Sequence, residues 1–331
     1  MKALLFNKIY RNLGKFPNFI KFMEGKKNIG EIFDLSVNLT DIRSKLYKNT
    51  YKFIGETPCY TVYLPNNNTL RIKMECLNPM GNSHYARYWI PYLFIAEELQ
   101  IIKPFSSHII DVTSGSAGIA LAIAANKLGY DSTIIVPRIL PQSRIKPMIE
   151  NKANVLKVDG YIGKCIDKLI DIIDSNGFFP SNHSEEKSDF ITHVFSRIAY
   201  EYINQYDYPD YAIIGLGNGT TTYSIFKQFK KSLKTNCISY HPHLEKEQIV
   251  FGLYGPNVKL RHVDIADKIT DKKVYTNNIN LNIVFDYFKN DTEINSLGAS
   301  SLYAIAIALE VSQEVKNKSF MTLAYDRITR Y

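Results

Sequence analysis

The sequence predicts an α/β fold in which largely parallel sheets are covered by helices. From about residue 51 onward, short apolar runs typical of strands alternate with longer runs typical of helices. In addition, two glycine-rich turns each connect a predicted strand to a predicted helix. The chain of 331 residues is long enough to bury a substantial core, in one large domain or two interlocked domains.

The first predicted elements are two strands, at 60–64 and 70–74, separated by a turn of Pro65 and three asparagines. A helix is expected at 88–100. Further strands are expected at 108–112, 132–136, 154–158 and 211–214, and further helices at 119–128, 143–151, 165–175, 190–205 and 224–231. The alternation indicates parallel sheets, which bind ligands at the carboxyl ends of their strands.

Composition excludes several classes of protein. Hydrophobic residues make up 45% of the chain and charged residues 22%, which is typical of a globular protein. No apolar run is long enough to cross a bilayer, so we expect a soluble protein without a membrane partner. The four cysteines are widely spaced and form no C-x-x-C pair. This pattern argues against a metal site or a disulfide framework and fits the reducing cytoplasm.

The formal net charge of +8 raises the question of a nucleic-acid partner. The lysines, however, are scattered and mostly alternate with Asn, Ile and Tyr, a composition that an AT-rich genome also produces. Nucleic acid is therefore not expected as a partner. The most basic part, residues 1–50, is predicted to be a separate N-terminal arm. Its patchy apolar pattern indicates that the arm packs on the main body or on a second subunit.

A small, hydroxyl-rich turn follows the strand predicted at 108–112. It consists of Thr113, Ser114, Gly115, Ser116 and Ala117. Backbone N–H groups at the start of a helix point outward, and the helix dipole adds partial positive charge there. The turn is therefore predicted to bind a carboxylate or a phosphate. An ordinary helix cap would have the same composition.

A second turn, Gly215 to Thr222, directly follows the strand predicted at 211–214. Its glycines at alternate positions allow the backbone to form a concave nest of N–H groups, and its threonines add hydroxyl donors. It is not a Walker A loop, because no Gly-Lys-Ser/Thr follows. A tight structural turn is the alternative to a phosphate site. The residues predicted to hold the phosphate are Gly217, Asn218, Gly219, Thr220 and Thr221.

Segments from about residue 50 to the end resemble, in order, the motifs of one family. They are Ile54–Pro58 (like IGNTP), Lys73–Gly81 (like K-x-E-x-x-NPTG), Thr113–Gly118 (like TSGNTG), Pro137–Arg144 (like MPxxMSxER), Gly215–Thr221 (like GIGTGGT), Gly298–Ser301 (like GISSG) and Tyr325–Tyr331 (like PDSGERY). The chain thus resembles the cysteine synthase and cystathionine β-synthase family, whose members are pyridoxal-phosphate enzymes with the tryptophan synthase β-like fold.

The resemblance implies a larger α/β domain of residues 51–84 and 190–331 and a smaller one of residues 85–189. It also implies pyridoxal phosphate as the cofactor, a small amino acid as the substrate, and a homodimer. The turn at 113–117 would hold the substrate carboxylate, although Ala117 lacks the hydroxyl that the family has there. Ser116 would also contact the ring hydroxyl of the cofactor, and Asp326 would lie near its pyridine nitrogen.

The covalent attachment of the cofactor is in doubt. In the family, NPTG is followed by Ser, an apolar residue and the lysine that binds the cofactor covalently. Counting from Gly81 places His84 at that position, whereas one inserted residue places Tyr85 there. No lysine occurs between Lys73 and Lys103. Histidine and tyrosine can move a proton, but neither can tether the cofactor as lysine does.

The first functional prediction is a cytoplasmic lyase or transferase of amino-acid metabolism. It would catalyse β-elimination or β-replacement on a serine- or cysteine-like amino acid. His84 or Tyr85 would shuttle the proton, or a lysine from elsewhere, such as Lys73, would take the family role. Lys73 is more simply interpreted as a structural partner of Glu75 or of a neighbouring residue. The alternative is a non-catalytic protein of the same fold that binds an amino-acid or phosphate ligand, or partners an active paralogue.

Other polar side chains receive structural interpretations. Glu201, within a predicted helix, is interpreted as solvated or capping. His183, in the segment Pro180–His183, resembles part of a family loop that could lie near the cofactor, but it is interpreted as a surface residue. His241 and His243 lack a Cys or acidic partner at ligand spacing, so a loop is expected there rather than a metal site. Trp89 is expected to pack its helix on the sheet.

Overall fold

The computed structural model describes residues 29–176, 179–181, 183, 190–243, 250–253 and 260–331. They form two compact units. One contains the described residues up to Ile54 and Pro79–Val194, and the other contains Gly55–Asn78 and Phe195–Tyr331. We call them the carboxylate-loop unit and the phosphate-loop unit, after the turns that they contain. Residues 1–28 of the predicted arm lie outside the described residues.

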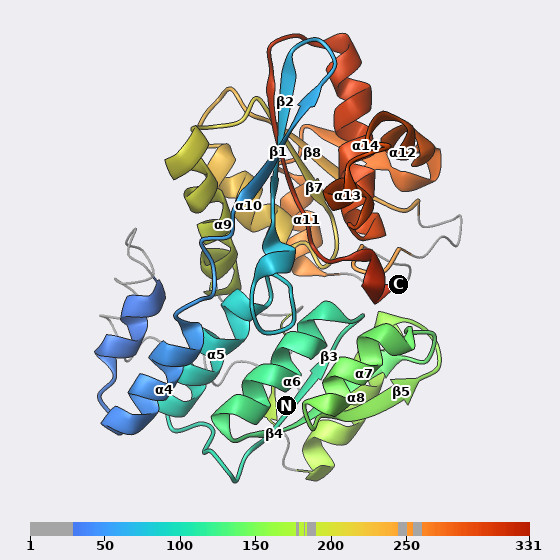
Figure 1. Cartoon of the computed structure of the whole chain (residues 1–331). Helices are drawn as coiled ribbons and strands as arrows, with labels where there is room; N and C mark the ends of the chain where they lie inside the picture. Colours follow the sequence, from blue (N-terminus) through green and yellow to red (C-terminus); the bar gives the residue numbers. More distant parts are fainter. Residues whose placement is uncertain (1–28, 177–178, 182, 184–189, 244–249, 254–259) are drawn as a thin grey trace. The chain divides into compact units, whose positions relative to one another are not determined.

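The phosphate-loop unit is built on a six-stranded sheet in the order β1-β2-β10-β7-β8-β9 (Figure 1). The predicted hairpin, β1 and β2, is antiparallel and places Cys59 opposite Lys73. All other neighbouring strands are parallel, so their carboxyl ends share one edge of the sheet. The strands are β1 (Cys59–Leu64), β2 (Asn68–Lys73), β7 (Tyr211–Gly215), β8 (Asn236–His241), β9 (Lys272–Tyr275) and β10 (Ser319–Leu323).

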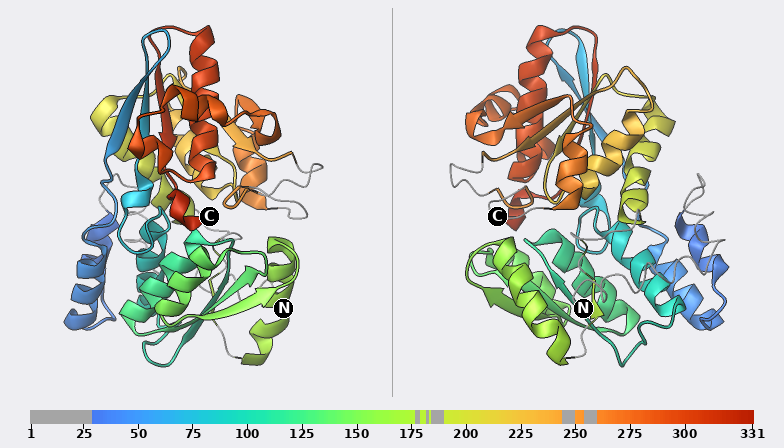
Figure 2. Two further views of the ribbon diagram at one scale, coloured as in Figure 1. Left: turned by 45° about the vertical axis from the view of Figure 1, so that its right-hand side comes forward. Right: turned by 180° about the vertical axis from the view of Figure 1, so that it is seen from behind.

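Helices cover both faces of this sheet. Figures 1 and 2 show α9 and α10 on one side and α12 and α14 on the other. The helix α14 is apolar nearly all round, and it is therefore buried along most of its length. The helices are α9 (Phe190–Tyr206, in this unit from Phe195), α10 (Thr220–Phe229), α11 (Arg261–Asp267), α12 (Asn282–Tyr287), α13 (Thr292–Asn295) and α14 (Ala299–Glu314), with 3-10 turns at Glu75–Leu77, Thr276–Asn278 and Ile328–Arg330.

The carboxylate-loop unit has a four-stranded sheet in the order β5-β4-β3-β6, in which every pair is parallel. Ile110 and Val112 on β3 pack with Ile135 against one face of α8. The strands are β3 (His108–Val112), β4 (Asp131–Pro137), β5 (Asn154–Val158) and β6 (Phe179–Pro180). The helices are α4 (Asp41–Tyr51), α5 (Ala86–Glu98), α6 (Ser116–Leu128), α7 (Gln142–Glu150) and α8 (Ile162–Asn176), preceded by a 3-10 helix at Ile29–Leu35.

The described part of the predicted arm is fixed to α5 of the same chain. Glu97 accepts two hydrogen bonds from the Arg43 guanidinium, at 2.8 and 2.6 Å, and one from Tyr47 Oη at 2.7 Å. The neighbouring Glu98 Oε1 accepts the backbone N–H groups of Val37 and Asn38 at 2.8 and 3.0 Å. Two adjacent carboxylates of α5 therefore hold α4 and the segment before it.

The observed architecture confirms the predicted fold class. β3 and β5 coincide residue for residue with the strands expected at 108–112 and 154–158. α6 and α10 begin earlier than expected, at Ser116 and Thr220, because the last residues of both turns already adopt the first helical turn. Among the described residues, no helix is long and apolar enough to cross a bilayer.

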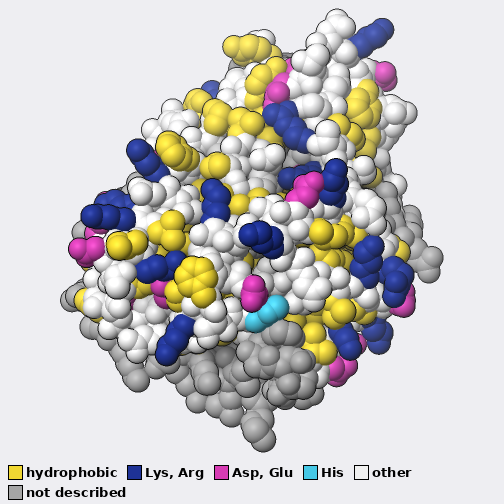
Figure 3. All heavy atoms as spheres, turned by 60° about the horizontal axis from the view of Figure 1, so that its bottom comes forward, with side chains coloured by type: hydrophobic (Ala, Val, Ile, Leu, Met, Phe, Trp, Pro, Cys, Tyr) yellow, Lys and Arg dark blue, Asp and Glu magenta, His cyan; other side chains and the backbone are white. Residues whose placement is uncertain are grey.

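Lys and Arg side chains do not gather into one stripe on the face drawn in Figure 3. They are scattered among hydrophobic and acidic side chains. The arrangement on that face therefore resembles the scattered pattern of the lysines along the sequence.

Candidate active site

The carboxylate loop lies at the carboxyl end of β3, as predicted. Thr113 Oγ1 accepts a hydrogen bond from the Gly115 N–H at 3.0 Å, which closes the turn. Gly115 has a φ of 143°, a conformation that side-chain-bearing residues rarely adopt. α6 then begins at Ser116, so the N–H groups of its first turn and the positive end of its dipole lie at this loop. The site predicted from Thr113, Ser114, Gly115, Ser116 and Ala117 is thus a helix N-terminus.

A buried arginine supports this loop. The Arg144 side chain, from α7, is 1% exposed, and its Nη1 donates to Ser114 O at 3.3 Å. A Cβ added to Gly115 would lie 2.6 Å from that Nη1, so the guanidinium packs directly against the loop backbone. Sequence reasoning placed Arg144 within a motif but did not single it out. The positive charge of Arg144 against the predicted carboxylate loop is the feature that it missed.

Tyr161 also contacts the loop, through a hydrogen bond with Ser114. Burial raises the pKa of Tyr161 to about 12. Its phenol is therefore neutral at physiological pH and acts as a fixed hydrogen-bonding group.

The residues at the family's lysine position lie at the start of α5. His84 is buried, Tyr85 is partly exposed, and their ring centroids are 4.3 Å apart. The preceding turn is packed tightly on α6, because a Cβ added to Gly81 would lie 3.1 Å from Ala120 N. Both candidates thus lie in the carboxylate-loop unit, on a segment held against the helix whose N-terminus forms the carboxylate loop.

His183 is not a surface residue, so the interpretation from the sequence was wrong. It is 3% exposed, and its Nδ1 lies 2.6 Å from Asp111 Oδ2. The loop that carries it follows β6, where Ser181 N donates to Ile110 O at 3.0 Å. Sequence reasoning missed the pair because β6 has only two residues and gives no periodic signal.

Trp89 is fully buried, and its Nε1 donates to Ala117 O at 2.8 Å. The side chain therefore joins α5 to the first turn of α6, in addition to the packing role expected from the sequence. Its ring centroid lies 5.8 Å from that of His183. Trp89 thus stands between the carboxylate loop and the Asp111–His183 pair.

The phosphate loop lies at the carboxyl end of β7, again as predicted. Gly219 has a φ of 87° and precedes α10, which begins at Thr220. A Cβ added to Gly217 would lie 2.5 Å from Gly252 O, and one added to Gly219 would clash with the backbone of His262. Glycine is therefore required at both positions. Thr221 is buried on the first turn of α10.

Asn218 caps this loop. Its Oδ1 accepts hydrogen bonds from Thr220 N at 3.1 Å and Thr220 Oγ1 at 2.6 Å. The family threonine that it replaces has a shorter side chain with a hydroxyl group. Asn218 therefore shares the first turn's donors with any phosphate that binds here.

Asp326 lies just beyond the carboxyl end of β10 and is 4% exposed. Its backbone O accepts the Gly298 N–H at 3.0 Å, and Tyr331 Oη donates to its Oδ1 at 3.4 Å. The neighbouring Tyr325 Oη accepts the Gly215 N–H at 2.9 Å. The predicted pyridine-nitrogen partner is thus connected, within one unit, to the strand that leads into the phosphate loop.

Lys73 and Glu201 form a buried ion pair with a distance of 2.8 Å from Nζ to Oε2. The interpretation of Glu201 as solvated or capping was therefore wrong. Lys73 Nζ also donates to Thr57 O. Glu75, two residues further on, accepts hydrogen bonds from Thr57 Oγ1 at 2.7 Å and Asn78 Nδ2 at 2.8 Å. Both charged residues of the K-x-E pattern are therefore buried and bond with Thr57.

His241 is a buried residue at the end of β8, and burial lowers its pKa. Its Nδ1 lies 2.8 Å from Pro242 O. In the part of the chain that the structure describes, no group of three or more His, Cys, Asp or Glu side chains is placed to hold a metal ion.

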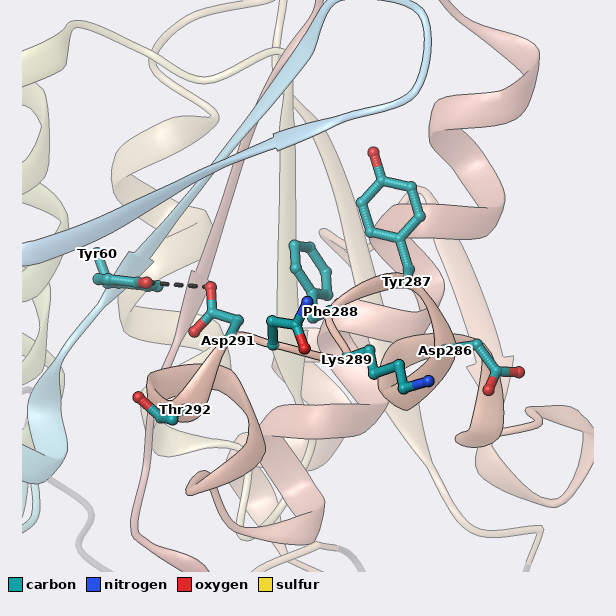
Figure 4. A pocket seen from close by; sticks show the side chains of 8 residues that line it. Tyr60, Asp286, Tyr287, Phe288, Lys289, Asp291 and Thr292 are labelled. Carbon is teal, nitrogen blue, oxygen red and sulfur yellow. Dashed lines mark hydrogen bonds between the residues drawn. The ribbon is translucent and has the colours of Figure 1, made fainter.

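A surface pocket of about 620 Å³ lies in the phosphate-loop unit around the connection from α12 to α13 (Figure 4). Across it, Tyr60 Oη bonds with Asp291 Oδ2 at 3.0 Å. None of the predicted cofactor or carboxylate residues lines this pocket. It is therefore separate from the candidate site.

Comparisons with known proteins agree with the motifs. Cysteine synthase A of Escherichia coli (strain K12) is 30% identical over 135 residues, which is 40% of this chain and 41% of that protein. Cysteine synthase of Buchnera aphidicola subsp. Acyrthosiphon pisum (strain APS) is 28% identical over 201 residues, 59% of this chain and 63% of that protein. The matched regions thus span less than two thirds of these relatives.

Among solved structures, O-ureido-L-serine synthase superposes with a TM-score of 0.74 at 20% identity, covering 85% of this chain and 92% of that one. This likeness concerns the fold. The model of the family described as pyridoxal-phosphate dependent enzyme matches residues 51–275. The cofactor of that family confirms the cofactor predicted from the sequence. From residue 51 to residue 275, and in its fold, this chain belongs to the family of pyridoxal-phosphate dependent enzymes.

Proposed function

We propose that the chain is a pyridoxal-phosphate enzyme that catalyses β-elimination or β-replacement on a serine- or cysteine-like amino acid. One observation carries the proposal. Each unit has a helix N-terminus at the carboxyl end of a parallel strand, one after β3 and one after β7, and each has the sequence pattern of a distinct anion site. The cysteine synthases that match the chain support an amino acid of this kind.

The residues present fit the cofactor's phosphate and ring. The absence of side chains at Gly217 and Gly219 lets this loop pack against the backbone of Gly252 and His262. The N–H groups of the first turn of α10, which begins at Thr220, are the donors for an anion at this helix N-terminus. Thr221 adds a hydroxyl donor. Asp326, buried and acidic, suits a protonated pyridine nitrogen. When bound, pyridoxal phosphate withdraws electrons from the α-carbon of an amino acid, which makes its proton removable.

The chain's own residues would divide the work as follows. The first turn of α6 and the loop Thr113–Ala117 bind the substrate carboxylate, and the Arg144 guanidinium adds positive charge beneath them. Ser116 donates to or accepts from the ring hydroxyl of the cofactor. His84 or Tyr85, at the family's lysine position, can relay a proton to or from a neighbouring base. Lys73 holds the fold through Glu201 instead of binding the cofactor.

The test has two parts. Calorimetry with pyridoxal phosphate measures whether the chain binds the cofactor. Mass spectrometry then follows product formation from L-serine, O-acetyl-L-serine or L-cysteine, with and without sulfide. Turnover of any of these supports the proposal. Binding of the cofactor without turnover of any of them favours the non-catalytic alternative, and absence of binding contradicts the proposed enzyme.

We also propose a homodimer in the cytoplasm, with the arm near the interface. Large apolar side chains are exposed on and near the described arm: Leu35 (43%), Val37 (75%), Ile42 (80%) and Phe53 (70%). Such a group of exposed apolar side chains favours a protein partner, and a second copy is the simplest one. Light scattering at micromolar concentration should give twice the chain mass of 38.0 kDa. A monomer mass would contradict the dimer.

A further inference from the structure

The carboxylate-loop unit contains a buried histidine held by a carboxylate. Asp111 Oδ1 accepts the N–H of Val112 at 2.8 Å, which fixes the carboxylate on β3. Its other oxygen lies 2.6 Å from His183 Nδ1, with side-chain exposures of 1% for Asp111 and 4% for His183. Because a carboxylate only accepts, Nδ1 carries a proton in this contact, and Nε2 is the nitrogen at which the ring can gain or lose a proton.

Two parts of the candidate site lie around this pair: the residues at the family's lysine position and the carboxylate loop. The ring of Tyr85, one of the two candidates at the family's lysine position, lies 5.2 Å from the His183 ring in an edge-on arrangement. On another side, Trp89 reaches from His183 to Ala117 O in the carboxylate loop. All five residues belong to one unit, so their arrangement does not depend on the placement of the other.

We infer, on the basis of the function proposed above, that Asp111 and His183 are the acid–base pair of this chain, with His183 as the catalytic base in place of the family lysine. His183 Nε2 takes the proton from the α-carbon of the bound amino acid, and Asp111 stabilises the resulting imidazolium. The electron pair of the broken C–H bond stays with the substrate, where it expels the β-substituent. The proton then leaves His183 with that substituent.

The geometry of the pair can be measured without cofactor. In the cofactor-free protein, a proton shared by His183 Nδ1 and Asp111 gives a strongly downfield NMR resonance, which the Asp111→Asn variant should lose. The same resonance should remain in His108→Gln, a matched control. His108 lies on the same strand at its amino end, where its Nε2 lies 2.8 Å from Thr133 Oγ1. Absence of the resonance from the unmodified protein would contradict the pair.

The chemical role is measured by exchange of the α-proton of the amino acid in heavy water, with pyridoxal phosphate bound. His183→Gln should slow exchange by about 100-fold or more, while calorimetry gives unchanged affinities for pyridoxal phosphate and the amino acid. A purely structural histidine would change affinity and rate together. His108→Gln should exchange at the unmodified rate.

If His183→Gln exchanges the α-proton at the rate of the unmodified protein, His183 is not the catalytic base. If that variant does not fold, Asp111→Asn decides, because it preserves the shape of the pair: slowed exchange at unchanged affinity supports the base, and unaltered exchange overturns it. If the unmodified chain binds pyridoxal phosphate but exchanges no proton, the proposed function itself is contradicted. This outcome differs from a wrong assignment of the base, in which the unmodified chain and His183→Gln exchange the proton equally fast.

Discussion

Lys73 and Glu201 form an ion pair that is closed to solvent, with 0% and 4% of their side chains exposed. Lys73 lies at the end of β2 and Glu201 on α9, so the pair fixes this helix to the sheet of the phosphate-loop unit. Because Nζ also donates to Thr57 O, the ammonium group is committed to structural partners. This arrangement argues against Lys73 as a substitute for the missing cofactor lysine.

Lys73→Met should destabilise the protein by about 3–5 kcal/mol, because it leaves the Glu201 carboxylate buried without its counter-charge. Adding Glu201→Leu should recover part of this loss, since both buried charges are then absent. Urea unfolding measures the change. Lys48→Met is the control: the Lys48–Asp34 pair is exposed at 54% and 57%, and its loss should cost at most about 1 kcal/mol. Equal effects of the two single variants would contradict a structural role for the buried pair.

Borohydride reduction in the presence of pyridoxal phosphate, followed by peptide mass mapping, should find no adduct on Lys73. Its amino group is buried and bonded to Glu201 and Thr57, whereas reaction with an aldehyde requires an accessible amine. His84 and Tyr85 should also carry no adduct, because imidazole and phenol do not form such a bond. A stoichiometric adduct on Lys73 would restore the usual role of a lysine and contradict this prediction.

Thr221→Val should weaken binding of pyridoxal phosphate by about 1–3 kcal/mol, because the buried phosphate would lose a hydroxyl donor. Thr235→Val is a matched control in the same unit. Thr235 is also buried, and its Oγ1 donates to Pro209 O at 2.7 Å, just before β8 and thus near the opposite edge of the sheet. Calorimetry should give an unchanged affinity for that control. An unchanged affinity for Thr221→Val would contradict the predicted phosphate site.

Strands and turns were predictable where the sequence has local signals. β3 and β5 are short apolar runs bounded by polar residues, and both glycine-rich turns were located at strand ends because glycine and hydroxyl residues mark such turns. The described helix α4 was not predicted. It has a low apolar content and depends on contacts from Arg43 and Tyr47 to Glu97, which are more than 45 residues away in sequence.

Pairing between distant side chains was the part that the sequence could not reveal. Lys73 and Glu201 are 128 residues apart by their numbers, and Asp111 and His183 are 72 apart. Glu201 and His183 each belong to a type of residue that is usually found in a different environment. A carboxylate on a helix is usually solvated, and a histidine in a loop is usually exposed. Only the fold brings the partners together, and their burial then requires the pairing.

Gly115→Val tests the carboxylate loop, because a bulky side chain there should block an amino-acid ligand. The variant should also affect the fold. Gly115 has a φ of 143°, and a Cβ there would lie 2.6 Å from Arg144 Nη1 and 2.7 Å from its Cδ. The substitution must therefore strain the loop and displace the buried guanidinium, at a cost of about 1–3 kcal/mol in unfolding free energy.

The sharper variant for ligand binding is Ser114→Ala, because the Arg144 contact is made by the backbone O of Ser114 and is retained. It removes the hydroxyl that bonds with Tyr161 and should leave the thermal midpoint within a few degrees of the unmodified value. Gly115→Val should abolish the thermal shift that L-serine or O-acetyl-L-serine produces, and Ser114→Ala should reduce it. If the shift survives in Gly115→Val, the loop is only structural, and the substrate carboxylate binds elsewhere.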